Sequence, residues 1–236
     1  MSPLLVLAAI AFGYLFGSIP FSKLVGKLSA GQSEVADIDV AVPGHDETYK
    51  VTAKGAAAVS MSLGARAGCL QGFLDMAKVA IPTLVFKLLY PQDPYLLIAA
   101  AAGMVGHIWP VFNRFKGGRG ISSVYGALFV IDWIGAFAVA TGGLLIGLFI
   151  ARDFIIAYLS GLWLLIFWAW FLTHDFAYLG YALFVNVIFV IAMIPDLRQY
   201  IKFRKDRQVD LSLVMSMTPM GRGMQRIMQF GRLRRH

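Results

Sequence analysis

Long stretches without a charged side chain constrain this chain most. Residues 3–22, 154–173 and 176–195 carry none, and 95–113 contains His107 as its single ionisable group. Each stretch is close to the roughly 20 residues that a helix needs to cross the hydrocarbon of a bilayer. With 58% hydrophobic and 14% charged residues, the composition is typical of an integral membrane protein and excludes an ordinary soluble domain.

Three further spans are less regular. Residues 68–90 form an apolar stretch that carries Asp75, Lys78 and Lys87. Residues 120–151 are too long for one span and are interrupted at Asp132, so we divide them into 120–131 and 133–151. The sequence therefore predicts an all-α, polytopic membrane protein with seven transmembrane helices.

The distribution of positive charge predicts how these spans are oriented. If the N-terminus lies outside, only Lys87 falls near the outer side and Lys78 falls within a span, so the other 19 of the 21 Lys and Arg lie on inner segments. Cytoplasmic segments are enriched in Lys and Arg. We therefore expect the N-terminus outside and the C-terminus in the cytoplasm.

The first apolar stretch is predicted to be a retained membrane anchor. Its cations, Lys23 and Lys27, follow the apolar run, whereas a cleaved signal peptide has them in front. Cys69 is the single cysteine, which excludes an intramolecular disulfide. The four histidines show no i, i+4 pair, so we expect neither a metal site nor a cofactor.

The segment 23–67 interrupts the membrane pattern on the inner side. It contains an acidic patch and then becomes small and apolar from Lys54 onward. Alternation of apolar and charged residues over 36–42 indicates a short strand that would end at the Pro43-Gly44 turn. A flexible connector is equally consistent with this composition.

The tail, 196–236, is strongly basic, with ten Lys and Arg against three Asp. From about residue 219, methionines alternate with arginines in a pattern that predicts a helix lying on anionic lipid. A disordered tail that only sets topology is the alternative. Nucleic acid is not an expected partner, because the rest of the chain lies in a bilayer.

Residues 112–120, Phe-Asn-Arg-Phe-Lys-Gly-Gly-Arg-Gly, lie between two apolar stretches. Glycines allow a close backbone approach, and cations with free amides bind phosphate. We therefore expect a phosphate site at Lys116, Gly117, Gly118, Arg119 and Gly120. The alternative is a basic loop that only sets topology, but orientation requires charge and not three glycines.

Three ionisable groups lie within or beside the spans. Asp75 and Lys78 are three residues apart and so share a helix face. They either neutralise each other and extend toward the inner surface, or line an inner cavity that holds an anion. His107 precedes the glycine loop, and we treat it as a candidate general base or phosphate ligand, the alternative being a packing residue. Pro110 is expected to bend the helix there and to free backbone carbonyls.

Three segments carry a family resemblance: Gly17-Ser-Ile-Pro-Phe-Ser22, Phe73-Leu-Asp-Met-Ala-Lys78 and the stretch from Gly106-His to Gly120. Together they resemble the bacterial PlsY family, the integral membrane acyl-phosphate:glycerol-3-phosphate acyltransferases. The last is the most specific, because the family pattern Gly-His-x-x-Pro-Val-Phe-x-x-Phe-Lys-Gly-Gly-Lys-Gly differs here only by Arg119. The resemblance covers about residues 5–200 and implies a cytoplasmic, phosphate-binding glycine loop.

The chain departs from the family in two places. The first cytoplasmic motif of the family supplies Ser, two Asn and an Arg, where this chain has Val51, Ala53, Ala58 and Met61. Arg66, Lys50 or Lys54 could replace the missing arginine. The C-terminal motif is also missing, and the approximate positions hold Asp196, Ile201 and Lys202.

The resemblance implies acyl transfer from acyl phosphate to glycerol 3-phosphate, or a related acceptor, in phospholipid synthesis at the bacterial inner membrane. Because an acyl phosphate is already activated, no protein nucleophile is required, and the residues that carry the chemistry are not assigned. The alternatives are an inactive homologue that binds acyl phosphate or lipid headgroups, and a transporter. The expected organisation is a membrane domain over 1–200, with an insertion at about 30–49, and a basic cytoplasmic tail over 201–236.

Overall fold

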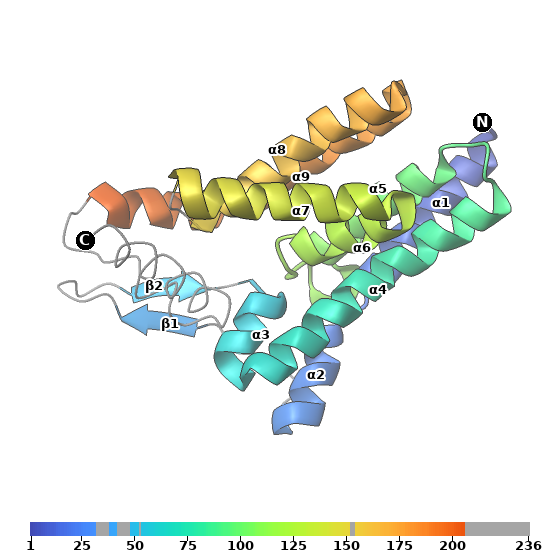
Figure 1. The fold of residues 1–236 in the computed structure, drawn as a ribbon. Coiled ribbons are helices and arrows are strands. Elements are labelled where there is room, and N and C mark those ends of the chain that lie inside the picture. The colour runs from blue at the N-terminus through green and yellow to red at the C-terminus, as the bar shows by residue number, and fades with distance from the viewer. Residues whose placement is uncertain (32–37, 42–47, 52, 152–153, 206–236) are drawn as a thin grey trace.

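The computed structural model describes residues 1–31, 38–41, 48–51, 53–151 and 154–205, and this part of the chain is mostly helical (Figure 1). The elements in chain order are α1 (Pro3–Gly17), α2 (Phe21–Ala30), β1 (Ile38–Ala41), β2 (Thr48–Val51), α3 (Ala56–Leu63), α4 (Ala65–Leu89), α5 (Tyr95–Ile108), the short 3₁₀ turn η1 (Val111–Asn113), α6 (Ile121–Ile131), α7 (Trp133–Leu145), the π-helical turn η2 (Ile146–Ala151), α8 (Phe154–Thr173) and α9 (Phe176–Lys205). The prediction of a mostly helical protein is therefore confirmed, and the described part also contains one small β-hairpin.

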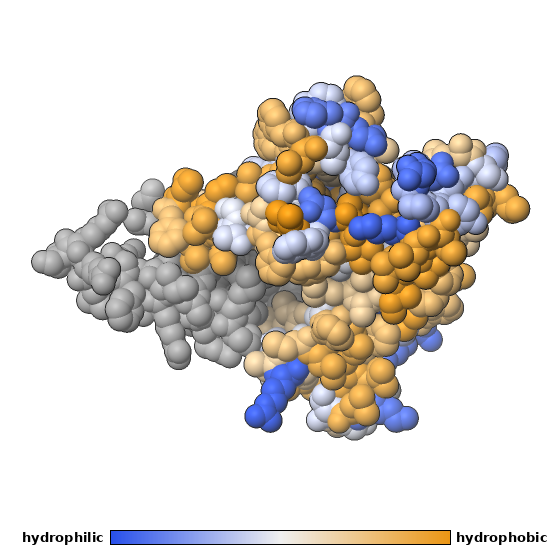
Figure 2. All heavy atoms as spheres, turned by 45° about the vertical axis from the view of Figure 1, so that its right-hand side comes forward, coloured by the Kyte–Doolittle hydropathy of each residue, from blue (hydrophilic) through white to orange (hydrophobic). Residues whose placement is uncertain are grey.

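Four helical stretches within the described residues are long and apolar enough to cross a membrane. They are Pro3–Ala30, Tyr95–Asn113, Trp133–Ala151 and Phe176–Gln199. Large apolar side chains also point outward, among them Leu88, Phe137 and Phe171, which are 71%, 58% and 67% exposed. Figure 2 shows apolar residues over most of the visible face of the helical part. Such an exterior suits contact with lipid.

The predicted division of 120–151 at Asp132 is confirmed, and its physical cause is a helix cap. The Asp132 carboxylate accepts a hydrogen bond from the Gly135 amide at 3.0 Å and another from the Trp168 indole at 2.6 Å. The first bond satisfies an amide at the start of α7, as an N-cap aspartate does. The second joins the same corner to α8.

Lys87 lies in the last turn of α4 and donates to carbonyls at the end of another helix. Its ammonium group donates to the backbone carbonyls of Val130 and Ile131, which terminate α6. The last carbonyls of a helix lack partners within the helix and carry partial negative charge. Lys87, a cation within an apolar stretch, is thus stabilised by hydrogen bonds to the terminal carbonyls of α6.

The crossing of α1 and α5, which run side by side in Figure 1, joins α1 to a core whose buried residues come mostly from α4 to α9. A Cβ atom added at Gly13 would overlap the backbone of Ala99, and one added at Gly17 would overlap the backbone of Gly103. Small residues four apart allow two helix backbones to approach closely, and in a membrane this packing replaces the hydrophobic effect as the source of helix association.

The segment between α2 and α3 contains regular structure. β1 and β2 pair as an antiparallel hairpin in which Ile38 lies opposite Val51 and Ala41 opposite Thr48. The strand predicted within 36–42 is therefore confirmed, whereas the Pro43-Gly44 turn lies outside the described residues. The same holds for the helix predicted from about residue 219.

The α1–α5 crossing predicts that Gly17→Ala is destabilising. The added methyl group must displace the Gly103 backbone, and overpacking of this kind costs about 1–3 kcal/mol. Gly180→Ala on α9 is the matched control, because a Cβ atom there meets nothing within 4 Å. Thermal unfolding of both variants in one detergent checks this. Equal midpoints for the two would show that the crossing does not require glycine.

Candidate functional site

The polar face of α4 is the foundation of the candidate site. Gln71, Asp75 and Lys78 follow one another at spacings of four and three residues, and their exposed fractions are only 2%, 0% and 5%. The Gln71 amide donates to one carboxylate oxygen of Asp75 at 2.9 Å, and the Lys78 ammonium lies 3.0 Å from the other. A carboxylate buried this deeply requires such partners, because an unpaired buried charge is very costly.

Lys78 also joins α4 to the break between α1 and α2. Its ammonium donates to the Ile19 carbonyl at 3.0 Å. The helix is interrupted here, where Pro20 has no amide hydrogen, and the Ile19 carbonyl accepts from the Phe21 amide at 3.1 Å as well as from Lys78. Lys78 is therefore paired and buried and does not extend to the surface.

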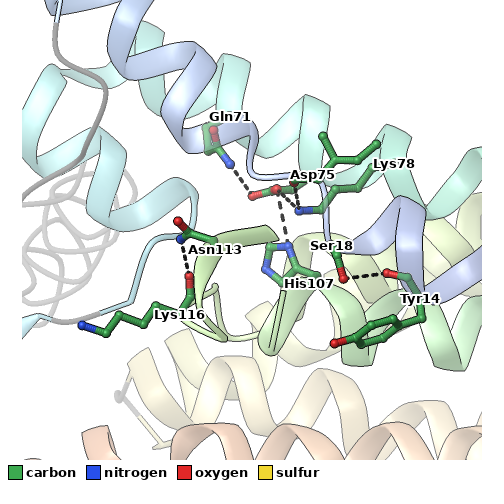
Figure 3. A network of polar contacts seen from close by, with 9 residues as sticks. Tyr14, Ser18, Gln71, Asp75, Lys78, His107, Asn113 and Lys116 are labelled. Atoms are coloured by element: carbon green, nitrogen blue, oxygen red, sulfur yellow. Dashed lines mark hydrogen bonds and ion pairs between the residues drawn. The ribbon is translucent and has the colours of Figure 1, made fainter. Parts of the chain in front are cut away.

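His107, near the end of α5, completes the cluster (Figure 3). Its Nδ1 atom lies 3.4 Å from the carboxylate oxygen of Asp75 that also contacts Lys78, and the side chain is 4% exposed. A carboxylate beside one ring nitrogen orients the imidazole, and the other nitrogen, Nε2, faces Gly118 of the glycine loop. Asp75, Lys78 and His107 thus form one buried charged cluster, named below the Asp75 cluster.

The glycine loop, residues 109–120, folds back over His107. The Gly118 amide donates to the His107 carbonyl at 3.2 Å. A Cβ atom at Gly118 would overlap Nε2 of His107, and one at Gly117 would overlap the carbonyl oxygens of His107 and Ile108. These glycines therefore make room for the end of α5, and their role in binding phosphate stays a prediction.

Several amides of the loop are used within the loop itself. The Phe115 amide bonds to Pro110 and the Lys116 amide to Asn113, while the Asn113 side chain donates to the Lys116 carbonyl at 2.6 Å. By contrast, the amides of Gly117, Arg119 and Gly120 have no acceptor among the described residues.

Pro110 ends α5, as the sequence predicts, and two of the freed carbonyls have new donors. The His107 carbonyl accepts from Gly118, and the Trp109 carbonyl accepts from the Tyr14 hydroxyl at 3.0 Å. These bonds tie the loop and α1 to the end of α5. The break in the helix is therefore closed by specific partners and forms part of the site.

A hollow lies between the Asp75 cluster and the glycine loop. Its space is about 240 Å3, including the part that opens to solvent. The enclosed part has room for roughly one water molecule. Lining residues come from the α1–α2 break, the segment before α3, α4, the end of α5 and the loop: Ile19, Pro20, Phe21, Ser22, Lys54, Gln71, Asp75, Lys78, His107, Pro110, Asn113, Lys116, Gly117 and Gly118. Three lysines and one aspartate give this lining an excess of positive charge.

Among the cations that could replace the missing arginine, Lys54 lines the hollow. Its backbone amide donates to the Gly117 carbonyl at 3.0 Å, which fixes this segment beside the glycine loop. Arg66 is exposed in the first turn of α4 and lies outside the lining. Lys116 is also exposed, and its ammonium group points away from the Asp75 cluster in Figure 3.

Arg119 and Gly120 lie elsewhere than the sequence suggests. The Arg119 guanidinium forms two bonds with the Asp196 carboxylate on α9, at 2.5 and 2.8 Å, and does not line the hollow. Gly120 has φ +97° and starts α6. In this arrangement the Arg119 side chain therefore lies outside the hollow and is paired with Asp196.

Sequence reasoning did not single out Gln71, Ser22 or Asn113. Gln71 could have been found from its spacing, since it lies one helical turn before Asp75 on the same face. Ser22 and Asn113 lie beside helix breaks, and no periodic pattern marks them. Within the described part of the chain, no group of three His, Cys, Asp or Glu side chains is placed to hold a metal ion.

Comparison with known proteins agrees with this architecture. The family model for glycerol-3-phosphate acyltransferase matches residues 7–203. A glycerol-3-phosphate acyltransferase of Exiguobacterium sibiricum is 36% identical over 125 residues, which are 53% of this chain and 54% of the relative. One of Aquifex aeolicus is 31% identical over 139 residues, 54% of this chain and 66% of the relative. The chain thus spans about half the length of the curated relatives it matches.

Two solved structures share the fold. Crystal structures of PlsY, an integral membrane glycerol 3-phosphate acyltransferase, in its lysophosphatidic acid and glycerol 3-phosphate forms superpose with TM-scores of 0.67 and 0.66. Each covers 84% of this chain and 93% of its own, at 23% and 24% identity. Since the family model covers most of the chain, this protein belongs to the glycerol-3-phosphate acyltransferase family.

Proposed function

We propose that this protein transfers an acyl group from an acyl phosphate to glycerol 3-phosphate, as a step of phospholipid synthesis in the bacterial inner membrane. The observation that carries this proposal is the Asp75 cluster beneath the glycine loop. It places a histidine oriented by a carboxylate at the base of a lysine-lined hollow. The family membership supplies the reaction class.

In the proposed reaction, a hydroxyl oxygen of the acceptor attacks the acyl carbonyl. The new ester bond forms as the bond from the acyl carbon to the phosphate oxygen breaks, and the phosphate leaves with the electron pair. His107 takes the hydroxyl proton at Nε2, and Asp75 stabilises the imidazolium that results. No covalent intermediate with the protein is required.

The lysines of the lining answer the other need of the reaction, which is to bring two anions together. Lys54, Lys78 and Lys116 offset the repulsion between the acceptor phosphate and the acyl phosphate. Gly117, which lines the hollow, supplies a further donor for phosphate oxygens with its amide. Because the enclosed space is small, the phosphates bind toward the open mouth of the hollow.

We propose seven spans, with the N-terminus outside and the C-terminus in the cytoplasm. Four of the spans are the long apolar stretches described above. The other three are α4, whose charges are paired inside the protein, the eleven-residue α6, and α8. The hollow then opens to the cytoplasm, where glycerol 3-phosphate is dissolved. The membrane domain covers 1–200, with an insertion at about 30–49, and 201–236 forms the basic tail.

The orientation predicts on which side Cys69, the single cysteine, can be labelled. Cys69 is exposed near the start of α4, on the proposed inner side. A membrane-impermeant maleimide should label it in inverted vesicles and not in intact spheroplasts. Asp93→Cys in a Cys69→Ser background is the control and should show the reverse pattern. Labelling of Cys69 from outside would contradict the proposed orientation.

Acyl transfer itself is the direct test of the function. Purified protein with acyl phosphate and glycerol 3-phosphate should release inorganic phosphate and form lysophosphatidic acid. We expect His107→Gln to lower kcat by about 100-fold or more, because it removes the proton acceptor. His174→Gln, the same change at the exposed turn between α8 and α9, should leave kcat unchanged. Binding of acyl phosphate without any turnover would replace this function with that of an inactive homologue.

The lining also predicts which cation compensates for the missing arginine. Lys54→Ala should raise KM for glycerol 3-phosphate about tenfold or more, since a hydrogen bond to a charged group contributes about 1.5–3 kcal/mol. The backbone bond from Lys54 to Gly117 survives this change. Arg66→Ala removes an exposed cation nearby and should leave KM unchanged. Steady-state kinetics with both variants decide this, and a larger effect of Arg66→Ala would reverse the assignment.

A further inference from the structure

A pair of charged side chains, Arg119 and Asp196, joins the glycine loop to α9. Nε of Arg119 lies 2.5 Å from one carboxylate oxygen of Asp196, and a terminal nitrogen lies 2.8 Å from the other. The pair joins residues 77 positions apart, and its side chains are only 21% and 17% exposed. A planar guanidinium that meets a carboxylate with two parallel bonds fixes both distance and orientation.

The backbone around Arg119 shows why this pair controls the loop. Gly118 precedes Arg119 and lies directly against Nε2 of His107, while its amide bonds to the His107 carbonyl. Gly120 follows with φ +97°, a conformation that favours glycine, and starts α6. Both neighbours of Arg119 are glycines without a side chain. A contact from another helix can therefore hold the backbone over His107 through the Arg119 side chain.

We propose that Asp196 is a positioning residue for the acyl-transfer site and acts through Arg119. By binding the guanidinium, Asp196 fixes the distance of Gly118 from the His107 ring. It also fixes the direction in which the amides of Gly117, Arg119 and Gly120 point. Arg119 thus serves the site with its backbone, and its charge is committed to α9. The predicted effect on acyl transfer rests on the proposed function, whereas the predicted effect on the position of the loop does not.

A lysine at position 119 would serve this role poorly. An ammonium group is a single point charge on a flexible chain and cannot form the two parallel bonds that orient a guanidinium. Asparagine at 196 would keep the shape and lose the charge that makes the bonds strong. We therefore expect Arg119→Lys and Asp196→Asn to weaken the pair to different degrees, because the first changes its shape and the second its charge.

Hydrogen exchange of the full-length protein in nanodiscs tests the structural part without any substrate. In Asp196→Asn, the Gly118 amide and its neighbours over residues 113–120 should exchange about tenfold faster. The charge swap Arg119→Asp with Asp196→Arg should restore slow exchange. Arg198→Gln removes an exposed charge from the same part of α9 and should change nothing. Unchanged exchange of the loop in Asp196→Asn would overturn the proposal.

Kinetics test whether the held loop matters for the reaction. Asp196→Asn should lower kcat/KM for glycerol 3-phosphate about tenfold, Arg119→Lys should lower it less, and the charge swap should recover most of the loss. An Asp196→Asn enzyme with wild-type kinetics and a faster-exchanging loop would also overturn the proposal. If the wild-type protein shows no acyl transfer, the proposed function fails, and the exchange measurement alone decides the role of Asp196.

Discussion

One buried carboxylate organises the part of this protein that holds the candidate site. Asp75 is fully buried in α4, in a mostly apolar segment, and a charge in that position is stable only with partners. It has three, which are Gln71 one turn earlier, Lys78 one turn later, and His107 on α5. The pairing fixes the rotation of α4 against α5. It also places an imidazole where the glycine loop and the hollow meet.

Two helix breaks complete what the carboxylate begins. Pro20 separates α1 from α2, and Lys78 donates to the Ile19 carbonyl at this break, while Pro110 ends α5 and the His107 carbonyl accepts from Gly118. At each break a backbone carbonyl is thus bonded to a group of the site. Irregular backbone in a membrane is tolerated where it lines a cavity or is buried in protein. The same bonds that satisfy it here also hold the site together.

Features that depend on the local sequence were predictable, whereas those that depend on contacts between distant residues were not. Hydropathy predicts the long helices, and the Asp132 corner and the strand at 38–41 follow from local patterns that the structure retains. The partner of Arg119 is different, because Asp196 is 77 residues away and nothing in either local sequence connects them. For the same reason the sequence suggests a phosphate role for the Arg119 side chain, whereas tertiary packing commits it to α9. Gly118 is needed partly for the His107 ring, a contact that only the fold creates.

The central claim is that the hollow over the Asp75 cluster receives the phosphorylated substrates. A structure determined with glycerol 3-phosphate and a non-reactive acyl phosphonate tests it most directly. We expect both phosphorus atoms to lie among Lys54, Lys78, Lys116 and the loop amides, with the acceptor hydroxyl within hydrogen-bond distance of Nε2 of His107. Ligands bound elsewhere, or a His107 that still lies covered by Gly118 and touches neither ligand, would contradict it.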